Sequence, residues 1–176
     1  MQHYFIEKEH KDSDYFEFED EVAGEKLKFK SCDSIFSKNE IDEGTRTLLE
    51  TVFNKVELKG NGLDLGCGYG VIGMTIIKHL GLNCDMIDVN GTAVELTRHN
   101  LMLNGLKKGA RVFKSNGFEN VTDNYDFIVT NPPIKTGKKL LFELMEGCFE
   151  HLNIGGTLTL VIRKDHGEES LKKKLM

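Results

Sequence analysis

The turn Asn131-Pro132-Pro133-Ile134 places residues of chemical interest directly after the apolar run at 126–130. Two adjacent prolines cannot continue a central strand, because neither has an N–H to donate to the ladder. Each proline fixes its own φ and forces the residue before it into an extended conformation. The turn is therefore rigid and holds two hydrogen-bond acceptors in fixed positions, the Asn131 side-chain oxygen and the Pro132 carbonyl. Together these can accept hydrogen bonds from the two hydrogens of an amine.

A second stretch, with the spacing G-x-G-x-G, follows one predicted strand and opens a predicted helix; it contains Gly66, Cys67, Gly68 and Gly70. Glycines permit a tight turn and let a ligand approach the bare backbone. A dinucleotide pyrophosphate is one possible ligand, but its fingerprint is G-x-G-x-x-G. Asp64 precedes the loop, and a carboxylate there would repel pyrophosphate. It would suit a cationic ligand such as a sulfonium amino acid.

Polar residues also end the next two predicted strands. Asp88 follows the loop by about 20 residues, where an acid usually binds a ribose diol through its two acceptor oxygens. Asn116 closes the third strand, and its amide is placed to read an adenine edge, although a plain turn before Gly117 fits this position equally well.

Short apolar segments alternate with helical ones from about residue 60 onward. Strands are predicted at 62–65, 83–88, 110–115, 127–130 and 157–163, and helices at 71–80, 92–104 and 138–151. This alternation predicts an α/β fold in which a parallel central sheet carries helices on both faces.

The first 43 residues have a different pattern. The segments 15–19 and 26–30 both alternate, one carrying Glu and the other Lys, with Ala23-Gly24 between them. Facing Glu and Lys rows suit an antiparallel β-hairpin. We expect residues 1–43 to be a hairpin extension of a single domain that spans 1–176, with the core at 44–176.

The composition is that of an ordinary globular protein of 176 residues with a net charge of −5. No apolar run approaches the roughly 20 residues that span a bilayer, and the N-terminus lacks the plan of a signal peptide, so we expect a cytoplasmic protein without membrane contact. The four cysteines form no CxxC pair and the six histidines are scattered, so no metal site is predicted.

The order of these features resembles that of class I S-adenosylmethionine-dependent methyltransferases. The tetrapeptide NPPI is similar to the amino-methyltransferase signature (N/D)PP(Y/F/W/I). The phrase FSKNEIDEGT at 36–45 resembles the stretch before the cofactor domain in the "small" methyltransferase-domain family, which includes the small-subunit ribosomal RNA guanine-2-amino methyltransferases. NPPIKTGK is close to the form in the single-domain bacterial members. The resemblance covers roughly residues 3 to 165.

The resemblance implies a Rossmann-like fold with S-adenosyl-L-methionine as cofactor. It places cofactor contacts at Asp64, Gly66, Cys67, Gly68, Gly70, Asp88, Asn116 and Thr45. It places the catalytic turn at Asn131, Pro132, Pro133 and Ile134. Substrate contacts are expected at Lys38, Lys135 and Lys138, where a phosphate backbone would pass, although lysines at a helix start are often simply a solvated face.

The implied reaction is methylation of an exocyclic amine, whose delocalised lone pair makes it a poor nucleophile. Two acceptors that hold the amine hydrogens steer the lone pair toward the methyl group and stabilise the positive charge that develops on nitrogen. We expect the substrate to be the guanine 2-amino group of small-subunit ribosomal RNA, either free or in a subunit. Protein glutamine methylation, DNA adenine methylation and a cofactor-binding module without activity remain alternatives. Ile134 stands where many relatives carry an aromatic that stacks on the base.

The C-terminus departs from the family pattern. Class I methyltransferases usually follow the fifth parallel strand with a helix and an antiparallel hairpin, but only 13 residues follow Arg163. We therefore expect the two antiparallel strands to be missing and the chain to be truncated. An edge left open in this way favours association, so a homodimer is possible.

Overall fold

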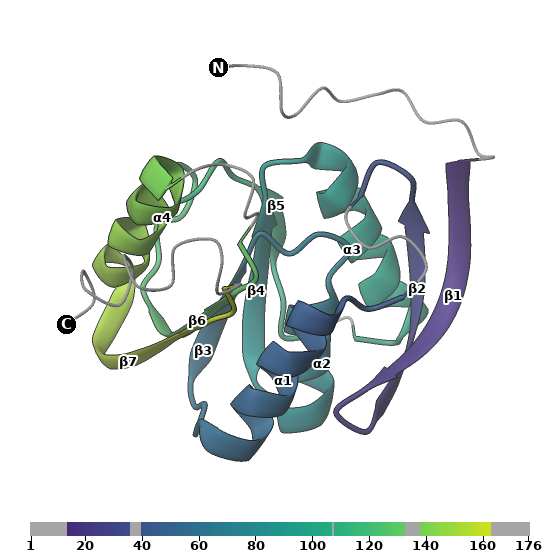
Figure 1. The fold of residues 1–176 in the computed structure, drawn as a ribbon, viewed down its shortest axis with the longest axis horizontal. Coiled ribbons are helices and arrows are strands. Elements are labelled where there is room, and N and C mark those ends of the chain that lie inside the picture. Colours follow the sequence, from purple (N-terminus) through teal and green to yellow (C-terminus); the bar gives the residue numbers. More distant parts are fainter. Residues whose placement is uncertain (1–13, 36–39, 107, 133–137, 163–176) are drawn as a thin grey trace.

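The computed structural model describes residues 14–35, 40–106, 108–132 and 138–162. Five strands form one sheet in the order β5-β4-β3-β6-β7, and every neighbouring pair is parallel (Figure 1). The strands are β3 (Asn61–Leu65), β4 (Asn83–Asp88), β5 (Val112–Lys114), β6 (Tyr125–Thr130) and β7 (Leu152–Leu160). The helices are α1 (Glu43–Lys55), α2 (Val71–Leu80), α3 (Gly91–Leu103) and α4 (Lys138–Glu150). The predicted α/β fold is confirmed.

Each face of the sheet has its own apolar core. On one face, Phe127 and Val129 of β6 pack in the same buried cluster as residues of α1, α2 and α3. On the other face, Leu63 and Leu65 of β3 pack with Met145 of α4. Alternate side chains of a strand point to opposite faces, so both core-facing rows of the central strands are mostly apolar, with Asp64 and Thr130 among the buried exceptions. Helices therefore cover both faces, as predicted.

The N-terminal hairpin has the predicted antiparallel pairing. It consists of β1 (Tyr15–Val22) and β2 (Glu25–Cys32) and lies beside α3 (Figure 1). Ala23 and Gly24 both have positive φ (51° and 79°), as a two-residue type I′ turn requires. The Glu and Lys rows face each other as expected, and Glu19 and Lys28 form an ion pair at 3.2 Å.

Two asparagines of α3 bind the edge of β2 as a neighbouring strand would. The Asn104 amide accepts from Lys28 N–H (2.9 Å) and donates to its carbonyl (2.7 Å). The Asn100 amide does the same with Lys30, at 2.7 and 3.0 Å. The two asparagines are one helical turn apart, and the residues they bind are two apart in the strand. One helical turn and two strand residues have similar lengths, so both asparagines can reach the strand edge. These contacts satisfy part of the β2 edge and attach the hairpin to the α/β core.

The structure differs from the sequence predictions at three elements. Helix α1 was not predicted from the sequence. Strand β5 is shorter than the predicted 110–115, and β7 begins at Leu152 instead of residue 157. The register along β7 jumps, because Tyr125 pairs with Leu152 whereas Phe127 pairs with Thr157. Gly155 and Gly156 lie in this irregular stretch of the strand.

The predicted absence of two antiparallel strands and the possible homodimer both concern the chain after β7. Residues 163–176 lie outside the described residues, so the dimer stays a prediction. In the described part of the chain, no helix is both long enough and apolar enough to cross a membrane.

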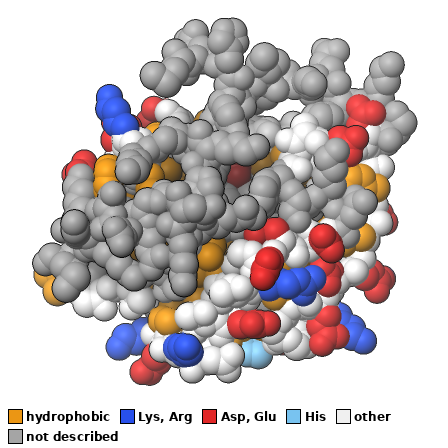
Figure 2. All heavy atoms as spheres, viewed as in Figure 1, with side chains coloured by type: hydrophobic (Ala, Val, Ile, Leu, Met, Phe, Trp, Pro, Cys, Tyr) orange, Lys and Arg blue, Asp and Glu red, His pale blue; other side chains and the backbone are white. Residues whose placement is uncertain are grey.

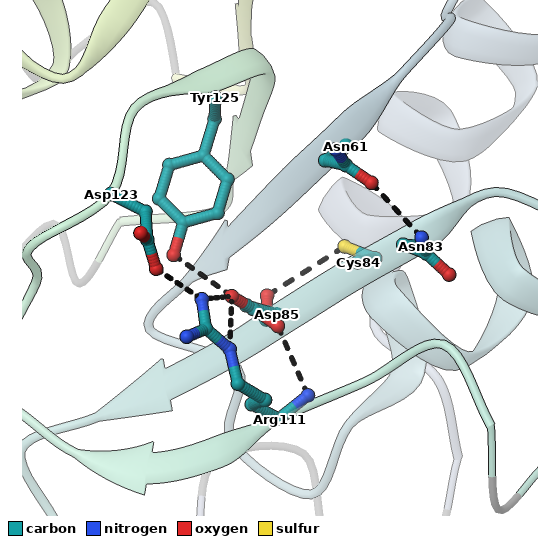
Figure 3. A network of polar contacts seen from close by, with 7 residues as sticks. All are labelled: Asn61, Asn83, Cys84, Asp85, Arg111, Asp123 and Tyr125. Carbon is teal, nitrogen blue, oxygen red and sulfur yellow. Dashed lines mark hydrogen bonds and ion pairs between the residues drawn. The ribbon is translucent and has the colours of Figure 1, made fainter.

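A polar network joins the amino ends of the strands, at the edge opposite the site described below (Figure 3). Asp85 of β4 accepts from the Arg111 guanidinium and from the Tyr125 hydroxyl of β6 (3.0 Å). Arg111 also pairs with Asp123, and Asn83 donates to the Asn61 side chain at 3.0 Å. The pKa of Tyr125 is raised by burial and by the nearby Asp85 carboxylate. The network fixes where β3, β4 and β6 begin relative to one another.

Gly62 is expected to be essential for the contact between β3 and β6. It pairs with Phe127, and a Cβ added at Gly62 would lie 1.9 Å from a ring carbon of that buried side chain. We expect Gly62→Ala to lower the free energy of unfolding by about 1–3 kcal/mol in urea titrations, because the ring must move in a packed core. In a Phe127→Leu background the same substitution should cost less. Additive effects of the two substitutions would contradict this account.

Candidate active site

All five parallel strands end at one edge, where the sequence-predicted residues gather. The strand order reverses between β3 and β6, since the chain leaves β3 toward β4 and β5 and later returns to β6. Ligands of open α/β sheets bind in the crevice at such a reversal. The Thr130 hydroxyl donates to the Leu65 carbonyl at 2.7 Å and joins the two strand ends. The glycine loop after Leu65 and the turn at Asn131 are therefore direct neighbours.

The glycine loop presents bare backbone to open space. The N–H groups of Gly66 and Cys67 both donate to the Ile87 carbonyl at 2.9 Å, which bends the chain back over β4. Gly66 and Gly68 have positive φ (78° and 57°), and a Cβ at either would meet no atom within 4 Å. Gly70, at φ 98°, differs because a Cβ there would lie 3.0 Å from Thr97. The first two glycines thus leave room for a ligand, and the third allows α3 to pack closely.

Helix α3 holds the glycine loop through two side-chain hydrogen bonds. The Thr97 hydroxyl donates to the Gly68 carbonyl at 2.9 Å, and the Asn100 amide donates to the Tyr69 carbonyl at 2.9 Å. The Cys67 thiol lies 3.5 Å from the same Thr97 hydroxyl. Burial raises the pKa of Cys67, and Asp64 adds to this effect, so its thiol stays protonated.

The Tyr69 ring points away from the loop and into the hairpin. It makes edge contacts with Phe18 (6.0 Å between centroids) and Phe29 (5.3 Å). Since Phe29 is fully buried and Tyr69 is 4% exposed, this aromatic cluster belongs to the core. The hairpin therefore packs directly against a residue of the glycine loop.

Asp64 lies beneath the loop and differs from the sequence expectation of an anion offered to a cationic ligand. Its side chain has no exposed surface, one oxygen accepts from the Gly73 N–H at 2.9 Å, and the other has no partner among the described residues. The pKa of Asp64 is raised to about 7, mainly by burial and to a smaller degree by nearby Asp88, against the effect of the Gly73 hydrogen bond. At neutral pH the carboxyl is therefore partly protonated and holds the first turn of α2 to β3.

Asp88 ends β4 with its carboxylate toward the glycine loop. One oxygen accepts from the Gly68 N–H and the other from the Asn90 N–H, both at 2.9 Å. Burial raises the pKa of Asp88, and the hydrogen bonds from Asn90 and Gly68 oppose that effect. Each carboxylate oxygen retains a second lone pair, so Asp88 can still accept from two hydroxyls of a diol.

Asn131 follows β6 and contacts the first turn of α1. Its amide nitrogen donates to the Thr45 hydroxyl (3.0 Å) and to a carboxylate oxygen of Asp42 (3.2 Å). No described residue donates to the Asn131 side-chain oxygen. Pro132 is buried directly after it. Thr45, expected at the cofactor, thus lies against Asn131 in this structure.

Among the remaining predicted residues, Asn116 is the one whose side chain the structure describes. Asn116 is exposed at the end of β5, where its amide donates to Glu119 at 2.8 Å. Lys138 begins α4, but its side chain lies outside the description. The residues Lys38, Pro133, Ile134 and Lys135 lie outside the described residues.

Sequence reasoning missed three residues of the site, each of which carried a signal. Asp42 stands before a segment whose apolar residues recur at helical spacing up to Val52, and an acid in that position is typical of a helix N-cap. In the structure its side chain accepts a hydrogen bond from the Thr45 N–H at 3.1 Å. Thr97 and Asn100 are polar residues on the buried side of α3. Polar side chains on an apolar helix face need partners, so their spacing indicated a contact with the chain nearby.

Asp64 predicts an unusual pH dependence of stability. Its pKa in the folded state lies above that in the unfolded chain, so the folded protein binds more protons between about pH 4 and 7. The stabilisation is complete below pH 4 and is lost as the pH rises through about 7, by an amount on the order of 4 kcal/mol. In urea titrations from pH 4 to 8, wild type should therefore lose stability relative to Asp64→Asn.

Asp126 supplies the control for this experiment. The Asn61 N–H lowers its pKa, so wild type should gain stability relative to Asp126→Asn as the pH rises through the acid range. Parallel curves for wild type and Asp64→Asn would refute the raised pKa.

The sequence is similar to known methyltransferases. It matches the family model for the methyltransferase small domain over residues 26–176. It is 37% identical over 177 residues to the uncharacterized protein YbxB of Bacillus subtilis strain 168, a match that covers 99% of this chain and 87% of that protein. It is 36% identical over 155 residues to ribosomal RNA small subunit methyltransferase C of Escherichia coli, which covers 85% of this chain and 43% of that protein. The chain thus spans less than half the length of this second relative.

Solved structures share the fold. A 16S rRNA N2 methyltransferase (RsmC) of T. thermophilus, in complex with AdoMet and guanosine, superposes with a TM-score of 0.82 at 24% identity, over 91% of this chain and 45% of that one. The precorrin 8W decarboxylase of Methanobacterium thermoautotrophicum gives a TM-score of 0.63 at 19% identity, over 84% of this chain and 77% of that one. The architecture is that of class I methyltransferases. Since the family model covers most of the sequence, the chain belongs to the methyltransferase small domain family.

Proposed function

We propose that this protein transfers a methyl group from S-adenosylmethionine to the 2-amino group of a guanine in small-subunit ribosomal RNA, in the cytoplasm. The observation that carries the proposal is the fixed Asn131 amide beside the glycine loop. Its nitrogen is bound to Asp42 and Thr45, so its oxygen is the atom available to an incoming amine. The proposal treats residues 1–176 as one domain, in which the hairpin extends the catalytic core.

The residues around the glycine loop fit the cofactor. Gly66 and Gly68 face open space that a side chain would occupy, and Asp88 at the next strand end offers two acceptors to a ribose. The free oxygen of Asp64 is a buried acceptor beneath the same loop. Asn116 is assigned to the adenine edge, for which its amide must leave Glu119. When bound, S-adenosylmethionine supplies an electrophilic methyl group at this edge of the sheet.

Asn131 and Pro132 act on the amine that receives the methyl group. The Asn131 side-chain oxygen accepts one amine hydrogen and the Pro132 carbonyl accepts the other, so the nitrogen becomes more tetrahedral and its lone pair points at the methyl carbon. As the carbon–nitrogen bond forms and the methyl carbon–sulfur bond breaks, with S-adenosylhomocysteine as the leaving group, both acceptors stabilise the positive charge that builds on nitrogen. The methylated nitrogen then loses one proton readily, so no separate base is assigned.

The substrate class rests on the curated relatives. The E. coli protein that is 36% identical is a ribosomal RNA small subunit methyltransferase. The net charge of −5 is unusual for a protein that binds RNA alone. On the face shown in Figure 2, acidic and basic side chains are interspersed, without a continuous basic patch among the residues coloured there. A folded ribosomal particle, which also offers protein contacts, is therefore the favoured form of the substrate, with Lys38, Lys135 and Lys138 assigned to its phosphates.

The substrate class is tested by offering labelled S-adenosylmethionine together with four acceptors in parallel: naked ribosomal RNA, small ribosomal subunits, total protein and DNA. We expect label in small-subunit RNA, recovered as a guanine methylated on its 2-amino nitrogen after nuclease digestion. Label that appears only in protein would replace the proposal by glutamine methylation, and label in DNA adenine would exclude both.

Asn131 and Asp88 should separate chemistry from cofactor binding. Asn131→Ala removes an acceptor used mainly in the transition state, so kcat should fall by a factor on the order of 100 while cofactor affinity measured by calorimetry changes little. Asp88→Ala should instead weaken cofactor binding by about 1–3 kcal/mol, because charge-assisted hydrogen bonds are lost. Normal turnover by Asn131→Ala on the true substrate would disprove the two-acceptor mechanism.

A further inference from the structure

The side chain of Asn131 is held by residues far away in the sequence. Its amide nitrogen lies 3.2 Å from a carboxylate oxygen of Asp42 and 3.0 Å from the hydroxyl of Thr45. Both partners belong to the N-terminus of α1, where Asp42 is the N-cap residue. Thr45 is 5% exposed, and in the described part of the chain its hydroxyl contacts only Asn131. A polar side chain buried to this degree requires a partner, and Asn131 is that partner.

The chemistry of these partners fixes which way the Asn131 amide points. An ionised carboxylate has acceptors only, so the oxygen of Asp42 must face the NH2 group of Asn131 and not its carbonyl. A reversed amide would place two oxygens against each other. Because both N–H groups of the amide have partners on α1, the carbonyl oxygen is left on the other side, available to a substrate.

The first turn of α1 is itself fixed to the hairpin. The Arg46 guanidinium donates to the Ile41 carbonyl (3.1 Å) and to the Glu21 carbonyl of β1 (2.6 Å), and it pairs with the Asp20 carboxylate. Asp20 also accepts from the Ile41 N–H at 3.0 Å. The pKa of Asp20 is lowered, because hydrogen bonds from Arg46 and Ile41 outweigh the effect of burial. The segment that holds Asn131 is thus clamped on both sides of Asp42.

Space between the two elements is limited as well. A Cβ added at Gly44 would lie 3.0 Å from the Asp42 carboxylate oxygen and 3.5 Å from the Asn131 amide nitrogen. The close approach of the helix N-terminus to the catalytic turn therefore depends on glycine at this position.

We propose that Asp42 and Thr45 are positioning residues that orient Asn131 for the methylation of an amine. They do not touch the substrate, and they act by holding the NH2 group of Asn131 so that its oxygen is presented to the acceptor. The inference rests on the proposed function for its catalytic consequence, whereas the contact itself exists independently of the reaction. A displacement of about 1 Å at a reacting group can cost on the order of 100-fold in rate, so loss of one holding contact should lower turnover.

Thr45→Val and Thr45→Ser form a matched pair for the test. Valine has nearly the shape of threonine but no acceptor, and the N-cap contact from Asp42 to the Thr45 backbone is kept. We expect Thr45→Val to lower kcat about 10-fold or more, with the KM for each substrate and the cofactor Kd unchanged within about twofold. Thr45→Ser keeps the hydroxyl and should retain most of the turnover. Thr51→Val, on the same helix, should match wild type.

A double mutant distinguishes positioning from a general structural effect. If Thr45 acts through Asn131, then adding Thr45→Val to Asn131→Ala should cause little further loss, because the group it positions is already gone. An equal loss of kcat in both backgrounds would overturn the proposal. So would wild-type kcat in Thr45→Val while Asn131→Ala is impaired.

A second measurement does not depend on activity. In protein labelled with nitrogen-15, the Asn131 side-chain NH2 should exchange slowly with solvent in wild type and Thr45→Ser, and faster in Thr45→Val. Fast exchange already in wild type would refute the contact. Protected exchange in a protein that methylates none of the four acceptors would instead refute the proposed function and leave the contact standing.

Discussion

Strand β3 is hydrogen-bonded in parallel to β4 on one side and to β6 on the other, and the whole site depends on this arrangement. The helix after β3 covers one face of the sheet, and the helix after β6 covers the other. The two connections therefore leave the same edge in opposite directions, which opens the space between them. The glycine loop and Asn131 stand on the two sides of that space, tied by the hydrogen bond from Thr130 to the Leu65 carbonyl.

Helices behind the crevice hold each of its two sides in place. Helix α3 supports the glycine loop through Thr97 and Asn100, and α1 supports Asn131 through Thr45. The N-terminal hairpin contacts both helices, since β2 is bound by Asn100 and β1 by Arg46. What looked like an appendage in the sequence is thus connected to both halves of the site. Both supports contact the hairpin, and the Tyr69 hydroxyl of the glycine loop also donates to the Glu40 carbonyl, shortly before α1, at 3.4 Å.

The sequence predicted the parts of this protein that are determined locally. The glycine loop and the Asn-Pro-Pro turn are recognisable because the backbone itself demands glycine or proline there. Helix α1 was missed because its apolar face is short, and Asp42 was considered only as part of the phrase at 36–45 that carries the family resemblance. The burial of Asp64 was missed too, because an acid before a ligand loop suggests a charged contact. Its partner Gly73 and the raised pKa are consequences of tertiary packing.

The asparagine contacts at the hairpin also set the order in which the chain can complete its site. Lys28 meets Asn104 across 76 residues, and Thr45 meets Asn131 across 86. Contacts of this separation close large loops and form slowly compared with the hairpin turn or the helices. During synthesis the edge of β2 has no asparagine partner until residue 100 has emerged. Asn131 follows Asn100 by 31 residues in the sequence (131 − 100), so a growing polypeptide can complete the support of its glycine loop before the turn at Asn131 is held by Thr45.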